Sequence, residues 1–580
     1  MRVTNGMMRT NSMLNMQKNK VAYDKYLQQY NTQKKIQRPS DDPTIAVRAL
    51  KYRTTLTEIE QYQRNIDDAT SWMDATETAI KDVDKVMDSM VEYVTQAATG
   101  TVNAKDRADI TKQLDQYAQY IYEQDLNSDY AGRYLFTGYR TDSPLLFKAA
   151  QENVVYTIHE PIDVSNIRAY DYVYGRAEIG ATNPSDPKYK DAQTYANEAP
   201  QFLSTNRVLV GYQDLVDYSN NKKYDVTALD GTKSQADYVQ PYIIYKDRDG
   251  NECKVNVTVK SISDDKTYNE HLQPKSASEL AAMTPPGTAS TVTVTTATKQ
   301  ADGTYTTTTS TKTTGEVYLV PETGELVFAD DIYDDIRGGS DLMITYQKRE
   351  FDKNDIRPEH YFTCETVDTG TAGKAVYNTH SLDELNEMKA WDEYTKYSFR
   401  DQNIQYQINF SQTVTVNTEG KNAVDALVGR SIEDIKNSCN ELDVIEARMS
   451  EVDKRLADLD EGKDAKQIAD LTELKTQLQT QTDLQKSVLV KALGAMITTI
   501  QGAKDKINVA LADHGSRYNR MVMTRNKIDE LEMDTNQAKS DNEDADLGEA
   551  YINFTESNLL YQATLNATSK VLGQSLLDFI

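Results

Sequence analysis

The C-terminal stretch 546–580 carries a stripe of apolar side chains at helical spacing. Steps of three, four or seven separate its members, and an average step near 3.5 is typical of a coiled-coil seam. About 35 helical residues span roughly 50 Å, so we expect this helix to need a partner. The stripe consists of Leu547, Ala550, Phe554, Tyr561, Leu565, Leu572, Leu576 and Phe579.

A second apolar stripe near the N-terminus offers that partner. Leu14 and Val21 flank it. Because a residue that precedes proline is pushed out of the α region, Arg38 before Pro39 predicts that this helix ends near Ile36. We therefore expect residues 1–38 and 541–580 to pair as terminal helices. The N-terminal stripe consists of Met13, Met16, Tyr23, Leu27 and Tyr30.

A short joint with two prolines follows the N-terminal helix. Its residues are Arg38, Pro39, Ser40, Asp41, Asp42 and Pro43. Asp42 or Ser40 is suited to cap the next helix, and Pro43 suits its first position. A catalytic carboxylate pair is the alternative, but adjacent side chains point apart and no histidine is near. A polar, acidic hinge at 536–544 mirrors this joint near the other end.

Residues 39–150 and 421–540 are predicted to form a helical rod. Steps of three and four continue through 442–459 and 468–478 around a turn at 461–464, which predicts a helical hairpin at about 441–490. We expect an interruption at His514 and Gly515 in the helix that follows, and Asn103 as a cap of another. The strongest seam is Leu56, Ile59, Ile66, Ala69, Met73, Ile80, Val83, Met87, Met90 and Val94.

Residues 151–420 have a different texture, with alternating β-branched and aromatic side chains. Turn signals at Asp249-Gly250, Asp302-Gly303 and Thr323-Gly324 each separate two β-type runs, which predicts hairpins. Threonine-rich runs on both sides of Asp302 favour an exposed sheet edge. This region therefore reads as one or two β-rich outer domains inserted between helical halves. The fold class is α + β: an elongated, long antiparallel helical bundle or coiled coil formed by both chain ends, with an inserted β-rich domain.

Charge and motif content argue against several functions. The formal net charge is −26 and no dense Lys/Arg cluster exists, which disfavours nucleic acid and anionic membranes as partners. No apolar run of 18 residues and no ordinary secretory signal is present. The three cysteines and five histidines are scattered, so we expect no metal, no cofactor and no enzyme activity. His360 near Glu359 and Asp355 is the one local acid–histidine group, and we interpret it as a solvated loop.

Several motifs resemble the flagellin superfamily, in the variant found at the hook–filament junction. They are the 38–43 joint, Asn65-Ile66-Asp67-Asp68-Ala69, the stretch 132–138 with Thr141-Asp142-Ser143-Pro144, Glu543 to Leu547, and the ending 575–580. The resemblance covers roughly residues 1–147 and 490–580, with a weaker echo at 412–420. It departs from flagellin at Asp42-Pro43, where flagellin usually has Asp-Ala, and from short family members in its large β insert and its 441–490 hairpin.

The resemblance implies a structural subunit of the bacterial flagellum. It would be an adaptor that joins hook-associated protein 1 to flagellin, assembled with copies of itself in a ring. Export would proceed without cleavage of a signal peptide, with a cytoplasmic chaperone on the C-terminal helix, and would place the protein outside the cell. The assembly interface would comprise Met13, Met16, Tyr23, Leu27, Tyr30, Phe554, Tyr561, Leu565, Leu572 and Leu576.

Two other functions stay open at this point. One is a flagellin, the bulk subunit of the filament. The other is an adhesin role for the β-rich insert at 151–420, whose tyrosines and threonines suit polar or glycan contacts.

Overall fold

The computed structural model describes residues 5–99, 103–175, 177–261, 273–283, 285–300, 305–380, 384, 392–460 and 462–573, with the side chains of Asn5 and of 571–573 left out. The chain divides into two compact units, which we describe separately. The first unit comprises Met1–Ser71, Gln405–Thr415 and Ser516–Ile580, and the second comprises Trp72–Ile404 and Val416–Gly515. Helices α2 (Pro43–Thr99) and α12 (Ala465–Glu543) contribute residues to both.

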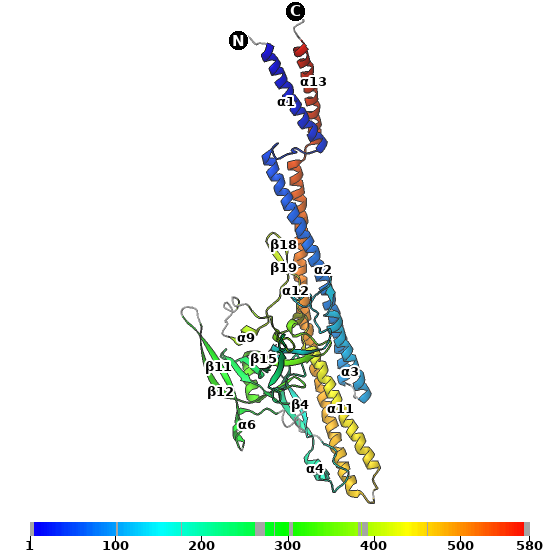
Figure 1. The fold of residues 1–580 in the computed structure, drawn as a ribbon. Helices are drawn as coiled ribbons and strands as arrows, with labels where there is room; N and C mark the ends of the chain where they lie inside the picture. Colours follow the sequence, from blue (N-terminus) through cyan, green and yellow to red (C-terminus); the bar gives the residue numbers. More distant parts are fainter. Residues whose placement is uncertain are drawn as a thin grey trace, which may run out of the picture. The chain divides into compact units, whose positions relative to one another are not determined.

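The first unit contains the two terminal helices, α1 (Asn5–Thr32) and α13 (Leu547–Gly573). They lie side by side and run antiparallel, so the start of α1 and the end of α13 lie at the same end of the pair (Figure 1). A small hairpin, β18 (Gln405–Asn409) and β19 (Gln412–Thr415), lies against α12 in the same unit. Arg520 of α12 donates a hydrogen bond to the carbonyl oxygen of Thr413 at 2.7 Å, which fixes the hairpin there.

The predicted seam of α2 is buried along its whole length. All ten of its apolar positions, from Leu56 to Val94, are at most 9% exposed. Ion pairs to α12 flank the seam in each unit: Arg525 with Asp67 at 2.8 Å, and Lys504 with Asp84 at 3.3 Å. Burial of a side chain of this size contributes roughly 1.5–3 kcal/mol. The seam is therefore the main source of stability for this helix.

The second unit adds two further helical pieces. Asn103 caps α3 (Ala104–Ala118) as predicted, in a capping box with Asp106, and α3 continues into a π-helical turn, η1 (Gln119–Asp125). The helix α11 (Leu427–Ala457) precedes α12. These two helices form a helical hairpin whose seam includes Leu442, Val452, Leu474 and Leu478.

Two main sheets make up the β-rich part of the second unit. The larger is an eight-stranded antiparallel sheet in which β15 and β3 are central and β12 and β17 are the edges. The predicted hairpins at Asp249-Gly250 and Thr323-Gly324 are confirmed, while Asp302-Gly303 lies outside the described residues between two paired strands. In order across the sheet, the strands are β12 (Tyr305–Thr314), β11 (Ser290–Lys299), β9 (Glu252–Asn256), β8 (Tyr242–Lys246), β15 (Ser340–Phe351), β3 (Gln151–Ile162), β16 (Thr363–Asp368) and β17 (Lys374–Tyr377).

The smaller sheet has five strands and packs near α11. Its strands are β10 (Thr258–Val259), β13 (Val317–Val320), β14 (Glu325–Phe328), β5 (Gln201–Leu209) and β4 (Arg168–Tyr174), in that order. Two strand pairs stand apart, β1 (Asp129–Tyr130) with β2 (Arg133–Tyr134), and β6 (Lys223–Thr227) with β7 (Lys233–Asp237). The short helices are η2 (Val164–Asn166), α4 (Ala192–Asn197), α6 (Ala277–Ala282), α7 (Asp330–Gly338), η4 (Pro358–His360), α9 (Glu393–Tyr397) and α10 (Gly420–Ala423).

The structure corrects three predicted boundaries. The acidic hinge at 536–544 is wrong, because α12 stays helical through Glu543 and breaks only over the next three residues. The interruption at His514 and Gly515 is also wrong, since both residues are helical. His514 is buried and its Nε2 lies 3.0 Å from the carbonyl oxygen of Met73, a contact that anchors the helix where a break was expected.

The third correction concerns the end of α1. The helix ends at Thr32 and not near Ile36, although no proline forces it to stop there. The next residue, Gln33, has a φ of 59°, in the left-handed region. Its carbonyl oxygen accepts a hydrogen bond from Ala545 at 2.9 Å, so a pairing with the other end of the chain ends the helix.

Candidate assembly interface and joint

An aromatic seam joins the two terminal helices. The ring of Tyr23 stacks on that of Tyr561 with centroids 5.6 Å apart, and Tyr30 stacks on Phe554 at 5.8 Å. One polar contact accompanies them, from the amide of Asn19 to Thr564 Oγ1 at 2.6 Å. Aromatic pairs at such distances contribute about 0.5–1.5 kcal/mol beyond the area that they bury. The seam therefore holds α1 and α13 in one antiparallel register.

The predicted interface residues divide between this seam and the solvent. Met16, Tyr23, Leu27, Phe554 and Tyr561 are half-buried within the helix pair. Exposed residues of the predicted set are Met13, Tyr30 and Leu565. Of Leu572 only the helical backbone is described, and Leu576 lies outside the described residues.

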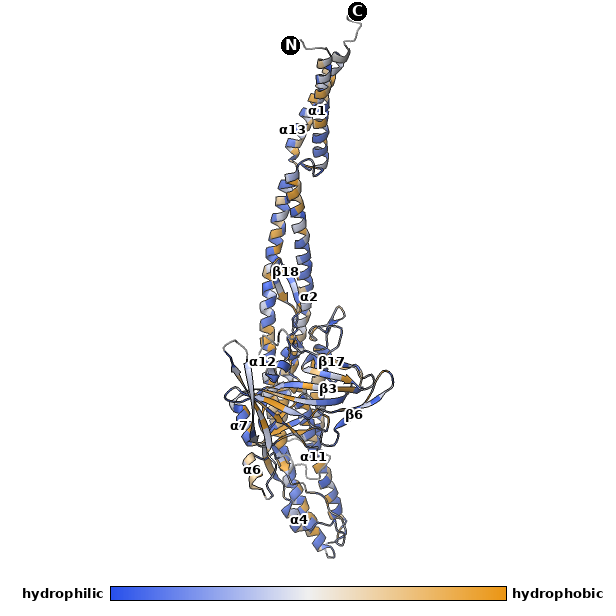
Figure 2. Cartoon of the chain, turned by 60° about the vertical axis from the view of Figure 1, so that its left-hand side comes forward, coloured by the Kyte–Doolittle hydropathy of each residue, from blue (hydrophilic) through white to orange (hydrophobic). Residues whose placement is uncertain are grey.

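The terminal helices also carry apolar side chains that α1 and α13 do not bury in each other. Figure 2 shows hydrophobic residues, in orange, along both helices. Ile552 and Leu559 each follow a buried residue, Ala550 or Ser557, by two positions, which turns them about 200° around α13 and away from α1. We define the outer face as Ile552, Leu559, Leu560 and Leu565 of α13 with Met8, Met13, Leu14 and Val21 of α1, all more than 40% exposed.

Covering these apolar side chains would be favourable. Large apolar patches are rare on monomeric soluble proteins. Each exposed leucine or isoleucine that becomes covered contributes roughly 1.5–3 kcal/mol. The outer face is therefore a candidate assembly interface.

The joint after α1 is organised by two aspartates. Asp42 caps α2, because its Oδ1 accepts hydrogen bonds from the amides of Thr44 at 2.9 Å and Ile45 at 3.2 Å, and Pro43 is the first helical residue as predicted. Asp41 turns the other way and accepts from the amides of Gln37 and Arg38. These backbone hydrogen bonds, first that of Arg38, hold the pKa of Asp41 below its ordinary value. Both carboxylates thus accept hydrogen bonds from backbone amides. This explains why two aspartates stand next to each other in the joint.

A second feature of the joint escaped prediction. Residues 33–35 pair antiparallel with residues 543–545, and we call this pairing the clasp. The amide of Lys35 donates to the carbonyl oxygen of Glu543 at 2.7 Å, and the amide of Ala545 donates to that of Gln33 at 2.9 Å. The clasp ties the end of α1 to the end of α12.

Charged side chains reinforce the clasp. Arg53 of α2 donates two hydrogen bonds to Glu543, at 2.8 and 3.1 Å, and Lys34 forms an ion pair with Asp544. Burial by itself would raise the pKa of Glu543, but Arg53 and Lys34 hold it below its ordinary value. The hydrogen bond from Lys34 likewise lowers the pKa of Asp544. Glu543 and Asp544 belong to a motif given in the sequence analysis. A local sequence pattern does not predict that they pair with Arg53 and Lys34, which are far away in the chain.

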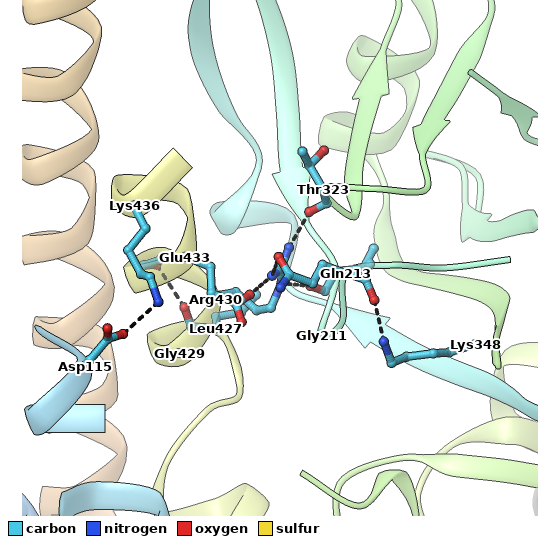
Figure 3. A network of polar contacts seen from close by, with 12 residues as sticks. Asp115, Gly211, Gln213, Thr323, Lys348, Leu427, Gly429, Arg430, Glu433 and Lys436 are labelled. Atoms are coloured by element: carbon cyan, nitrogen blue, oxygen red, sulfur yellow. Dashed lines mark hydrogen bonds and ion pairs between the residues drawn. The ribbon is translucent and has the colours of Figure 1, made fainter. Parts of the chain in front are cut away.

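In the second unit, two arginines connect α11 to the β-rich part. Arg430 of α11 donates to the carbonyl oxygen of Val210 at 3.0 Å and to Gln213 Oε1 at 3.3 Å, and it also contacts Glu433 and the Thr323 carbonyl (Figure 3). Arg207 of β5 reaches in the opposite direction to Asp434 of α11, at 2.7 Å. The two contacts are reciprocal and buried, so they fix the smaller sheet to α11.

The acid–histidine group at 355–360 is not a solvated loop. Glu359 and His360 are both buried, and Glu359 accepts from Arg357 at 2.6 Å and Arg140 at 3.4 Å. Burial lowers the pKa of His360 to about 4, and its Nε2 lies 3.0 Å from the Pro144 carbonyl oxygen. The interpretation failed because sequence spacing does not reveal burial. The group is a structural anchor for the stretch around Pro144.

Other reactive groups are placed as packing residues. The three cysteines are buried and unpaired, and burial raises the pKa of the Cys253 and Cys439 thiols to about 11. Within the described part of the chain, His, Cys, Asp and Glu side chains nowhere gather in threes as metal ligands would. The helices described here include none that is both long and apolar enough to cross a membrane.

Two family profiles match the chain at its ends. Residues 3–141 match the bacterial flagellin N-terminal helical region, and residues 497–580 match the bacterial flagellin C-terminal helical region. These stretches contain the outer face, the joint and the clasp. Most of the β-rich part lies between the two matches.

Similar proteins are flagellar proteins. Flagellar hook-associated protein 3 of Escherichia coli and that of Salmonella typhimurium are each 27% identical over 143 residues, which is 25% of this chain and 45% of the relative. A flagellin of Treponema pallidum is 23% identical over 220 residues, 36% of this chain and 74% of the relative. The chain thus spans less than half the length of the hook-associated relatives that it matches.

Solved structures of junction proteins are also similar. The FlgL structure from Xanthomonas campestris is 12% identical, with 84% of this chain and 99% of that chain covered and a TM-score of 0.28. The flagellar junction protein FlgL from Legionella pneumophila is 10% identical over 81% of this chain and 98% of that chain, with a TM-score of 0.24. The two ends of this chain therefore match the helical regions of bacterial flagellin, and part of the chain is similar in sequence to hook-associated protein 3.

Proposed function

We propose that this protein is a structural adaptor at the hook–filament junction of a bacterial flagellum. In this proposal it stands between hook-associated protein 1 and flagellin, in a ring of its own copies. The outer face of α1 and α13 is the observation that carries the proposal, because it offers apolar side chains to neighbouring subunits in a chain with flagellin-type ends. The similarity to hook-associated protein 3 favours the junction over other positions.

The proposal also assigns a route to the assembled state. An apolar outer face would aggregate in the cytoplasm, so a chaperone covers the C-terminal helix before export. The protein then leaves the cell without cleavage of a signal peptide and docks on the growing end of the structure. The clasp and the aromatic seam form as the terminal helices fold there.

A flagellin that forms the bulk of the filament is the second candidate. The match to the Treponema pallidum flagellin, which spans 74% of that protein, supports it. The two functions differ in copy number and position: a junction protein forms one thin layer, whereas a flagellin runs along the whole filament.

A charge-insertion experiment tests the outer face. Leu559→Asp combined with Leu565→Asp places two carboxylates on it, and we expect motility and filament attachment to be lost while the β-rich part stays folded. The matched control is Thr472→Asp combined with Thr480→Asp, which adds the same charge at exposed polar positions of α12 outside the outer face. Normal filaments with the leucine variant, in cells that export it at wild-type level, would contradict the proposal.

A further inference from the structure

A short segment crosses one face of the eight-stranded sheet in the β-rich part. We call residues 392–398 the strap. It contains α9, which Asp392 caps through a hydrogen bond from the amide of Thr395 at 3.2 Å. Below the strap lie β8, β9, β15 and β3. At its far end the ring of Tyr397 stacks on His159 of β3, with centroids 3.7 Å apart.

Two buried carboxyl groups meet where the strap begins. Asp392 is 1% exposed and Glu252 of β9 is 5% exposed. Glu252 accepts from the amide of Tyr394, two residues after Asp392, at 3.4 Å, and it stands opposite Lys246, the cation that pairs with Asp392. Two buried carboxyl groups placed side by side disfavour ionisation of both. The arrangement therefore favours one proton on the pair.

The remaining charges around the pair are mostly compensated. Lys246 of β8 lies 2.9 Å from Asp392 and 2.9 Å from Asp341 of β15. Lys254 of β9 pairs with Glu393 of the strap at 2.8 Å. Other titratable groups in this region are Tyr394, Lys396 and Tyr397 of the strap, Tyr242 of β8 and His159 of β3. Loss of the shared proton would therefore leave two adjacent buried carboxylates with Lys246 as their common cation.

We propose that the proton shared by Glu252 and Asp392 fastens the strap to the sheet, and that loss of this proton weakens the docking. Burial, followed by the contact with Asp392, raises the pKa of Glu252 to about 7 from 4.5. Because this pKa is raised, the contribution of Glu252 is complete below about pH 4.5 and is lost as the pH rises through about 7. Asp392 keeps a lowered pKa: burial opposes this, but Glu252 and Lys246 prevail.

His159 has the opposite effect on the pH dependence of strap docking. Burial under Tyr397 lowers its pKa to about 3, so it is neutral while the strap is docked. Its Nδ1 lies 2.9 Å from Thr345 Oγ1 and its Nε2 has no hydrogen-bond partner among the described residues. Release of the strap would let this ring ionise in mild acid, which favours release below about pH 6.5. The effect of Glu252 must therefore be measured against a variant that keeps His159.

Hydrogen exchange of the full-length protein provides that comparison. The protection of the strap amides, relative to intrinsic exchange, is measured from pH 5 to 8 in wild type and in Glu252→Gln, which imitates the protonated carboxyl. We expect the ratio of variant to wild-type protection to rise at least about tenfold over this range. The Glu393→Gln control removes only the pair with Lys254, so its ratio to wild type stays constant.

Two further measurements separate loss of strap docking from unfolding of the sheet. Peptides from β3 and β15 report whether the sheet stays folded in each variant. Asp392→Asn keeps a good capping residue and can donate to an ionised Glu252, so its protection relative to wild type also rises with pH. A pH-independent ratio for Glu252→Gln, with the sheet protected, would overturn the proposal, as would equal ratios for Glu252→Gln and Glu393→Gln.

Discussion

At the scale of single residues, α12 shows how a neighbour can overrule local propensity. Gly515 favours a break by itself, since glycine loses more backbone freedom in a helix than any other residue. The buried His514 beside it contacts the Met73 carbonyl and holds the helix together. A β-carbon added at Gly515 would meet no atom within 4 Å. The glycine is therefore tolerated by the helix, and no close packing requires it.

This arrangement predicts that Gly515→Ala stabilises the protein. The expected gain in free energy of unfolding is roughly 0.5–1 kcal/mol, because alanine has less freedom to lose and nothing obstructs its side chain. Urea unfolding followed by the helical circular dichroism signal measures it. Gly502→Ala is the matched control, since that glycine is also helical and unobstructed, and it should give a similar gain. A loss of stability for Gly515→Ala alone would show that the glycine is needed.

At the scale of elements, the clasp closes the joint that the sequence describes only in part. The prolines and aspartates at 38–43 predict a cap and a turn, and Asp42 and Pro43 act as expected. They do not predict that residues 33–35 pair with residues 543–545. The charges of Arg53 and Lys34 then select Glu543 and Asp544 as partners. The joint is thus a contact between both halves of the chain.

The clasp should open in acid. The pKa values of Glu543 and Asp544 are lowered by their partners, so their contributions are present above their ordinary values, 4.5 and 3.8, and are lost as the pH falls below them. Because Arg53 and Lys34 are largely exposed, we expect a loss of about 1 kcal/mol, near fivefold in amide protection. Hydrogen exchange at Lys35 and Ala545, compared between pH 6 and pH 3, measures it.

A charge-removing variant serves as the control for the clasp. Glu543→Gln loses the pair with Arg53 at every pH, so its amide protection should already be reduced at pH 6 and should fall less toward pH 3. Equal pH dependence in this variant and in wild type would contradict the assignment of the effect to Glu543.

The periodic elements were predictable and the single contacts were not. The ten seam residues of α2 repeat every three or four positions, a local signal that survives folding, and all are buried. The β hairpins at Asp249 and Thr323 follow from turn residues in the same way. Glu359 and Glu252 lie in short polar stretches whose burial is decided by distant strands, so the sequence offered no sign of it. The hinge at 536–544 failed because its polar residues also suit an exposed helix.

The same distinction holds for the candidate interface. The stripe from Leu547 to Leu565 predicts one apolar side of α13, but apolar residues lie on both sides, and the stripe does not say which side meets α1. The stacked rings of Tyr23, Tyr30, Phe554 and Tyr561 define that side. Ile552 and Leu559, which were outside the predicted stripe, are the side chains that turn away from it. The position of α1, which is known only from the structure, decides which side of α13 is the inner side and which is the outer side.

At the scale of the whole molecule, the chain has two ends that match flagellin helical regions and a β-rich part that lies mostly between those matches. The flagellin-type ends hold the outer face, the joint and the clasp, all in the first unit. The second unit contains the β-rich part, fixed to α11 by Arg430 and Arg207. In our account the flagellin-type ends carry assembly. The β-rich part, with its strap, lies outside most of the two matched regions.

The position of the protein in native flagella tests the central claim most directly. Antibodies against the β-rich part, visualised with gold particles by electron microscopy of intact flagella, locate it without any substitution. The account predicts a single narrow band of gold where the hook meets the filament. Gold along the whole filament would identify a bulk flagellin, and flagella without gold would exclude the protein from the structure; either result would contradict the account.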